Sequence, residues 1–132
     1  MTRLLSRFAG DRYLVNVRSP VQLGPRQEPQ PDLAIVRDRD YGSSLPGPED
    51  ILLLIEVSDT SLDYDREIKL PLYARAEIPE VWIVDLPGQA LELYTEPSGS
   101  GYAVKRRVSK VTTLASPTLP TLELDPAGFL PG

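Results

Sequence analysis

The sequence predicts an α/β fold, in which helices flank a mixed β-sheet core and an antiparallel β meander follows at the C-terminal side. Two observations carry this prediction. The run ILLLIEV at 51–57 is apolar at nearly every position, which is typical of a central strand covered on both faces. A segment with helical spacing follows it, and then a second apolar strand, EVWIVDL at 80–86. This strand, helix, strand order indicates a parallel crossover.

Length and composition limit the possible functions. The chain has 132 residues, so we expect one domain over residues 1–132. It contains no cysteine and no histidine, which excludes disulfides, thiolate metal sites and histidine catalysis. The net charge of −5 argues against attraction of nucleic acid to the whole surface, although it leaves room for a local basic patch. No run approaches the roughly 20 apolar residues of a membrane span, and none suits a secretory signal, so we expect a cytoplasmic protein without membrane contact.

Short elements are expected before the central strand. Residues 2–10 resemble the tail of a helix that stops at Gly10, and residues 12–20 alternate like a half-buried strand. Prolines in 23–31 prevent a strand there, and DLAIVRD at 32–38 reads as the next strand. A loop rich in glycine, proline and serine then leads to the central run.

The helix after the central strand is expected to begin at Thr60 or Asp63, because either residue is a suitable N-cap. Apolar residues recur in it near helical spacing, as on one face of a helix. They are Leu62, Ile68, Leu72 and Ala76. After the strand at 80–86, LPGQ predicts a hairpin, and ALELYTE and YAVKRRV supply the strands of the meander. The proline-rich segment 116–132 closes the chain.

Two acidic residues at predicted strand ends form a candidate site. Asp32 opens one strand and Glu56 lies near the end of the next, so antiparallel pairing would bring both carboxylates to the same edge of the sheet. Two carboxylates at short range repel, and the arrangement persists only if a cation, a proton or a lysine offsets the charge. Oxygen ligands suit Mg²⁺ or Mn²⁺, which need only one or two protein carboxylates.

Lys69 is the candidate for the third charge. On a helix that begins near Asp63 it lies about two turns in, from where it could reach back over the strand ends toward a metal-bound water or a phosphate oxygen. The alternative is a solvated ion pair with Asp65, four residues earlier. Such a pair is worth only about 0.3–0.5 kcal/mol.

Simpler interpretations also exist for the other residues. Asp32 follows Pro31 and could be only a turn residue that starts its strand. Glu56 is harder to explain this way, because an unpaired buried glutamate is costly. A basic stretch could follow a nucleic-acid backbone, but such a stretch is more often a solvated face. It consists of Lys105, Arg106, Arg107 and Lys110. Trp82 alternates with apolar neighbours and is expected to pack in the core.

These segments also resemble a known family. PDLAIV, followed by LLLIEVSDTSLDYDREIKLPLYARAEIPEVWIVDL, is similar to the bacterial Uma family of proposed endonucleases, in the PD-(D/E)XK or restriction-endonuclease-like superfamily. The shared features include an aspartate after proline at a strand start, a glutamate that ends the next strand, and the spacing of Asp65, Lys69 and Tyr73. The resemblance covers roughly residues 11–126 and implies that the N-terminal region of the family is mostly absent.

The resemblance implies a Mg²⁺- or Mn²⁺-dependent endonuclease with Asp32 and Glu56 as metal ligands and Asp32, Glu56 and Lys69 as catalytic residues. It also implies nucleic acid as the partner, with DNA the expected substrate. The superfamily usually places its lysine two residues after the second acid, where this chain has Ser58. In the family the lysine comes from the following helix, which is the place of Lys69.

Two departures from the family pattern lead to further expectations. A shortened N-terminal region could leave the site inactive, so a catalytically inactive nuclease-fold interaction module is the alternative function. It would also leave apolar surface exposed, for which a homodimer is the common solution. The family commonly has glycine where this chain has Glu77, and a left-handed backbone there would cost up to about 1 kcal/mol.

Overall fold

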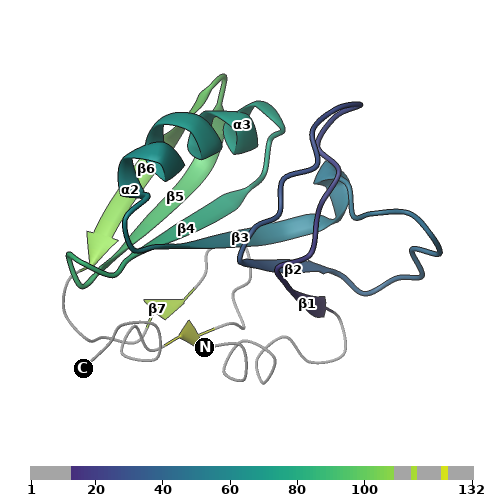
Figure 1. Cartoon of the computed structure of the whole chain (residues 1–132), viewed down its shortest axis with the longest axis horizontal. Coiled ribbons are helices and arrows are strands. Elements are labelled where there is room, and N and C mark those ends of the chain that lie inside the picture. The colour runs from purple at the N-terminus through teal and green to yellow at the C-terminus, as the bar shows by residue number, and fades with distance from the viewer. Residues whose placement is uncertain (1–12, 109–113, 116–122, 125–132) are drawn as a thin grey trace.

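The computed structural model describes residues 13–108, 114–115 and 123–124 and contains a six-stranded sheet (Figure 1). Its strands lie side by side in chain order: β1 (Tyr13–Val17), β2 (Leu33–Arg37), β3 (Ile51–Ser58), β4 (Glu80–Asp85), β5 (Ala90–Ser98) and β6 (Gly101–Val108). β3 and β4 are parallel, and the other neighbouring strands of this sheet are antiparallel. The predicted mixed sheet and the meander are therefore confirmed. A separate antiparallel pair consists of β7 (Leu114–Ala115) and β8 (Glu123–Leu124).

The helical segment between β3 and β4 has three consecutive parts. α2 (Leu62–Tyr64) continues into the π turn η2 (Asp65–Lys69) and then into α3 (Leu70–Arg75). At the end of the π turn, the N–H of Leu70 bonds to the carbonyl of Asp65, five residues earlier instead of four. Pro71 follows directly and has no N–H, so an uninterrupted α-helical ladder is impossible at this point.

Three of the four apolar residues predicted to face the core pack against it, namely Leu62, Leu72 and Ala76, and the fourth, Ile68, does not. Ile68 is 52% exposed, whereas Asp65 and Ala74 are only 2% and 1% exposed. Nine residues separate Asp65 from Ala74, which would place them about 180° apart on a regular α-helix. The π turn has more residues per turn than an α-helix, which changes the angle between residues before and after it. Both side chains can therefore face the sheet. The prediction that Ile68 lies on the apolar face was wrong, because it assumed a constant helical period.

The sheet separates two apolar clusters. On the helix side, Leu70 and Tyr73 pack with side chains that include Leu54 and Ile83. Alternate strand residues, among them the fully buried Trp82, form the cluster on the other face. β3 and β4 contribute to both clusters, as predicted for central strands. Among the described residues, however, helix lies on one face of the sheet alone, where the sequence predicted helices on both (Figure 1).

The structure also describes the helix exit and the segment before β3, while some predicted segments lie outside the described residues. The helix exit is left-handed at Glu77, whose φ is 60°. A short 3-10 helix, η1 (Pro48–Asp50), leads into β3. The predicted helix tail at 2–10, the residue Lys110 and most of the closing segment 116–132 lie outside the described residues. Within the described ranges, no helix has the length and apolar character of a membrane span.

Candidate active site

Asp32 and Glu56 meet where β2 begins and β3 ends. The antiparallel register pairs Leu33 with Ile55, so Asp32 and Glu56 come next to each other across the two strands. The backbone N–H of Asp32 donates to Glu56 Oε1 at 3.0 Å, and the N–H of Val57 donates to Asp32 Oδ2 at 2.7 Å. Each carboxylate is therefore held by the backbone of the opposite strand. The two acids chosen from the sequence lie together at one edge of the site.

Glu56 is 1% exposed, and its buried charge is matched by polar partners. The hydroxyl of Tyr73 donates to Glu56 Oε2 at 3.1 Å, and the ammonium of Lys69 lies 2.5 Å from the same oxygen. Burial raises the pKa of Glu56, although Lys69 and the N–H of Asp32 oppose the rise. Burial and the nearby Glu56 carboxylate also raise the pKa of Tyr73, so its hydroxyl keeps its proton and remains a donor.

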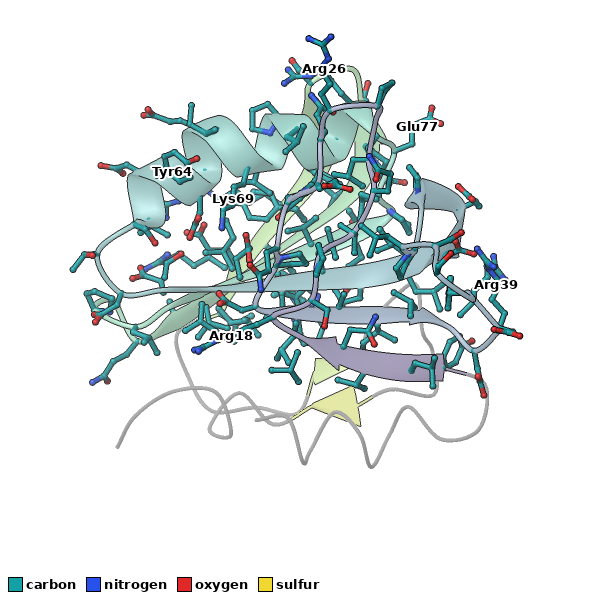
Figure 2. All side chains as sticks on the ribbon, turned by 45° about the vertical axis from the view of Figure 1, so that its right-hand side comes forward. Arg18, Arg26, Arg39, Tyr64, Lys69 and Glu77 are labelled. Carbon is teal, nitrogen blue, oxygen red and sulfur yellow. The ribbon has the colours of Figure 1, made fainter. Side chains whose placement is uncertain are left out.

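Lys69 extends from the π turn toward the sheet, as Figure 2 shows, and there it contacts Glu56. Its Nζ lies 2.5 Å from Glu56 Oε2 and 3.5 Å from Asp65 Oδ1. Burial alone would lower the pKa of Lys69, but the carboxylates of Glu56 and Asp65 outweigh that effect and raise it. The ammonium therefore stays charged. Both arrangements considered from the sequence are present, and the contact with Glu56 is the shorter one.

Asp65 contacts more of the site than Lys69, the one partner that the helical spacing predicted. Its side chain is buried and accepts hydrogen bonds from the hydroxyls of Ser58 and Ser61. Ser58 stands where the superfamily usually has its lysine, and here its hydroxyl fixes an acid beside Lys69. The Ser/Thr-rich turn between β3 and the helix was the one sequence feature that pointed to these hydrogen bonds. It did not show that Asp65 would accept them.

The charges of this cluster favour a cation. Three carboxylates, on Asp32, Glu56 and Asp65, face the ammonium of Lys69 and the exposed guanidinium of Arg18, which leaves a formal charge of −1. Asp32 Oδ1 accepts no hydrogen bond from any described residue, and Glu56 Oε1 accepts only one. Both oxygens can therefore still bind a ligand, and hard oxygen donors are what Mg²⁺ and Mn²⁺ bind in proteins.

The donor set limits what kind of metal site this could be. Over the ranges that the structure describes, no group of three or more histidine, cysteine, aspartate or glutamate side chains could hold a metal ion. A cation at Asp32 and Glu56 would therefore depend on two carboxylates together with water. Mg²⁺ is commonly bound in this way, because it keeps several of its waters. The residues present fit such an ion.

A second polar cluster lies on the same face of the sheet, and nothing in the sequence pattern singled it out. Glu92 on β5 is fully buried and accepts hydrogen bonds from Arg66, Tyr94 and Arg107. Arg107 also lies 2.9 Å from Asp85. Burial would raise the pKa of Glu92, but the three donors outweigh it and lower the pKa to about 2. The cluster joins the helix to β4, β5 and β6.

The basic stretch on β6 does not form one continuous cationic surface. Lys105 pairs with Tyr94 and Arg106 pairs with Leu93 across the strands. Tyr94 and Leu93 belong to opposite clusters, so Lys105 and Arg106 lie on opposite faces of the sheet. The Nζ of Lys105 lies 5.6 Å from the centre of the Tyr94 ring. The interpretation of this stretch as a nucleic-acid track therefore loses support.

Comparisons with known proteins agree with this geometry at the level of family and fold. A family model, Uma2, with the description "Putative restriction endonuclease", matches residues 1–127. A solved structure from Anabaena variabilis, described as "a putative nuclease belonging to DUF820", is similar at a TM-score of 0.63 and 11% sequence identity. That match covers 96% of this chain and 73% of the other, and at such low identity it concerns the fold alone. None of the curated proteins matches this sequence.

Proposed function

Since this chain belongs to the Uma2 family, whose model carries the description "Putative restriction endonuclease", we propose that it is a metal-dependent endonuclease. Its reaction would be hydrolysis of phosphodiester bonds in nucleic acid, with DNA as the expected substrate, in the cytoplasm. The observation that carries this proposal is the convergence of Asp32, Glu56 and Lys69 from two strands and a helix. The similar structure, described as a putative nuclease, agrees with this proposal at the level of the fold.

Asp32 and Glu56 would hold the divalent cation, Mg²⁺ or Mn²⁺. When bound, such a cation supplies positive charge that lowers the pKa of water and neutralises a phosphate. The N–H groups of Asp32 and Val57 already hold the two carboxylates in place, so the protein would need little reorganisation to bind it. The excess of negative charge in this cluster would repel a phosphate, and a bound cation would offset that repulsion.

Lys69 would stabilise negative charge on the phosphate during the reaction. Its raised pKa keeps it protonated, and Asp65 and Glu56 hold its ammonium at the edge of the acid pair. Tyr73 donates to the same oxygen of Glu56, so this carboxylate keeps a hydrogen bond when Lys69 turns to the substrate. One such preorganised contact typically contributes about 10²–10³ in rate.

A cleavage assay tests the proposal. Supercoiled DNA, single-stranded DNA and RNA are incubated with the protein and Mn²⁺ or Mg²⁺, and cleavage should require the metal and stop with a chelator. Asp32→Asn should abolish it, because asparagine keeps an oxygen for the N–H of Val57 but lacks the charge. Asp63→Asn, at an exposed acid near the start of the helix, is the matched control and should stay active.

Two results would contradict the proposal. Cleavage that survives Asp32→Asn would come from a different site or a different protein. Absence of both cleavage and Mn²⁺ binding would favour the inactive interaction module.

We also infer that the chain forms a homodimer. Tyr64 and Ile68 are 57% and 52% exposed and lie four residues apart on the helix that carries Lys69. Figure 2 shows Tyr64 on this helix. A closed two-fold contact between two such helices would remove both side chains from water. Sedimentation should show a dimer that Ile68→Glu converts to a monomer. A monomeric unmodified protein at high concentration would contradict the inference.

A further inference from the structure

Arg18 lies beside the acid pair and has no role in the chemistry proposed above. It is the first residue after β1, and its backbone N–H donates to the carbonyl of Asp32 at 3.0 Å. The side-chain amide of Gln30 donates to the carbonyl of Arg18. These two hydrogen bonds hold the backbone of Arg18 next to that of Asp32.

The backbone of Arg18 is in the left-handed region, with a φ of 50°. A residue with a Cβ is strained there, and glycine or asparagine would fit more easily. Strained residues persist where the surrounding structure enforces them, and they are common at functional sites. In this case the conformation directs the side chain to the acid pair, since Nε of Arg18 lies 4.0 Å from Asp32 Oδ1.

The guanidinium of Arg18 keeps free the hydrogen-bonding capacity that Arg39, Arg66 and Arg107 use on buried carboxylates. The Arg18 side chain is 79% exposed, and its guanidinium makes no hydrogen bond to any described residue. The guanidinium groups of Arg39, Arg66 and Arg107 each donate to a buried carboxylate instead. A contact of 4.0 Å with Asp32 is a weak, exposed ion pair. The donors of Arg18 are therefore open to a ligand beside the acid pair.

We propose that Arg18 binds a phosphate group of the nucleic acid substrate next to the bond that is cleaved. The inference rests on the proposed function, because a phosphate drawn to a cation at Asp32 would come within reach of this guanidinium. The planar fork of arginine matches two oxygens of a phosphate, and arginine is the common residue for such recognition. Lys69, beside Glu56, and Arg18, beside Asp32, would then both contact the phosphate backbone.

The variant Arg18→Asn separates this role from a structural one. Asparagine tolerates the left-handed backbone, so the melting temperature should stay the same or rise. Loss of the guanidinium should weaken DNA binding by about tenfold. It should also lower the slope of log Kd against log salt by about one, which is the effect of one lost phosphate contact. Binding of a labelled DNA duplex is measured by anisotropy with Mn²⁺, in a Lys69→Met background where cleavage is slow.

Two matched variants sharpen the comparison. Arg26→Asn removes an exposed arginine from a loop on another part of the molecule and should leave affinity and salt slope unchanged (Figure 2). Arg18→Lys keeps the charge but loses the fork, so it should keep the salt slope and recover part of the affinity.

The possible failures are distinguishable. If the unmodified protein cleaves DNA with Mn²⁺ but Arg18→Asn binds like Arg26→Asn, the role of Arg18 is overturned and the proposed function stands. A lower melting temperature with an unchanged salt slope would likewise assign Arg18 a structural role. If the unmodified protein neither binds nor cleaves nucleic acid, both proposals fall together.

Discussion

The ammonium of Lys69 lies closer to Glu56, at 2.5 Å, than to Asp65 in its own helix, at 3.5 Å. Glu56 is almost fully buried, so this contact differs from a solvated helical pair. Water screens an exposed pair, but it cannot replace the partner of a buried carboxylate. The position of Lys69 therefore has consequences for stability that do not depend on any enzymatic role.

Replacement of Lys69 by methionine should destabilise the fold by about 2 kcal/mol. This value lies between the cost for an exposed pair and the roughly 3–5 kcal/mol for breaking a fully buried one, because Lys69 is partly exposed. Chemical unfolding at neutral pH measures the change. Lys105→Met, on the same face of the sheet but over an aromatic ring, is the control and should cost less than about 1 kcal/mol. Equal effects of the two variants would contradict the prediction.

The same Lys69→Met protein should lose catalytic rate if the endonuclease proposal holds. The expected loss is about 10²–10³, because one preorganised positive charge disappears from the transition state. Single-turnover cleavage with excess protein measures this step. An unchanged rate would leave Lys69 with a structural role only.

Divalent metal should stabilise the protein through the acid pair. At a Mn²⁺ concentration of about ten times Kd, the free energy of unfolding should rise by about 1.4 kcal/mol. Thermal unfolding with and without Mn²⁺ measures the gain, and Asp32→Asn should abolish it. If the variant gains as much as the unmodified protein, the cation binds elsewhere.

Acid should destabilise the fold through Glu92. Its folded-state pKa of about 2 lies below the ordinary value of about 4.3 for an unfolded chain. The stabilisation is therefore complete above pH 4.3 or so and is lost as the pH falls toward about 2. Glu92→Gln should remove this part of the acid sensitivity and cost about 3 kcal/mol near neutral pH, because Arg66 and Arg107 lose their buried counter-charge.

Urea unfolding at a series of pH values measures this dependence. The exposed residue Glu67 provides the control, since Glu67→Gln should leave the acid dependence in place. Parallel pH profiles for the unmodified protein and Glu92→Gln would exclude the cluster as the source of the effect.

Glu77→Gly should stabilise the protein by up to about 1 kcal/mol, because glycine adopts a positive φ without strain. Glu67→Gly, in the right-handed part of the same helix, should instead destabilise it by about 1 kcal/mol. Thermal unfolding of the two variants should therefore shift in opposite directions. A loss of stability in Glu77→Gly would show that the glutamate side chain makes a contribution larger than the backbone strain.

The strands were predictable because their signals are local. The apolar run at 51–57 and its partner at 80–86 contain the information for a buried parallel pair, and the structure has β3 and β4 there. The helical face was not predictable in the same way. Apolar spacing assigns Ile68 to the core, but the π turn changes the phase of the helix in mid-course, and sequence periodicity does not report such a turn.

In the candidate site, too, the positions set by local sequence signals were predictable, and those set by distant partners were not. The proximity of Asp32 and Glu56 follows from strand ends and antiparallel pairing, both readable from the sequence. The places of Asp65 and Glu92 depend on partners that lie on other elements, such as Ser58 and Arg107. Arg18 had no signal at all, because its left-handed backbone is imposed by contacts with Asp32 and Gln30.

The π turn divides one helix into a part that makes charged contacts and a part that packs in the core. Asp65, Arg66 and Lys69 within it point their charges to the site and the neighbouring ion cluster, while Leu70 and Tyr73 beyond it anchor the helix in the core. A deletion of one residue in the turn would restore a regular repeat and rotate the charged half by about 100° relative to the anchored half. Chain-length variation of a single residue at this point could thus silence or restore the site while the scaffold stays intact. If the endonuclease proposal holds, insertion or deletion of one residue in this turn would change activity more efficiently than substitution of a side chain.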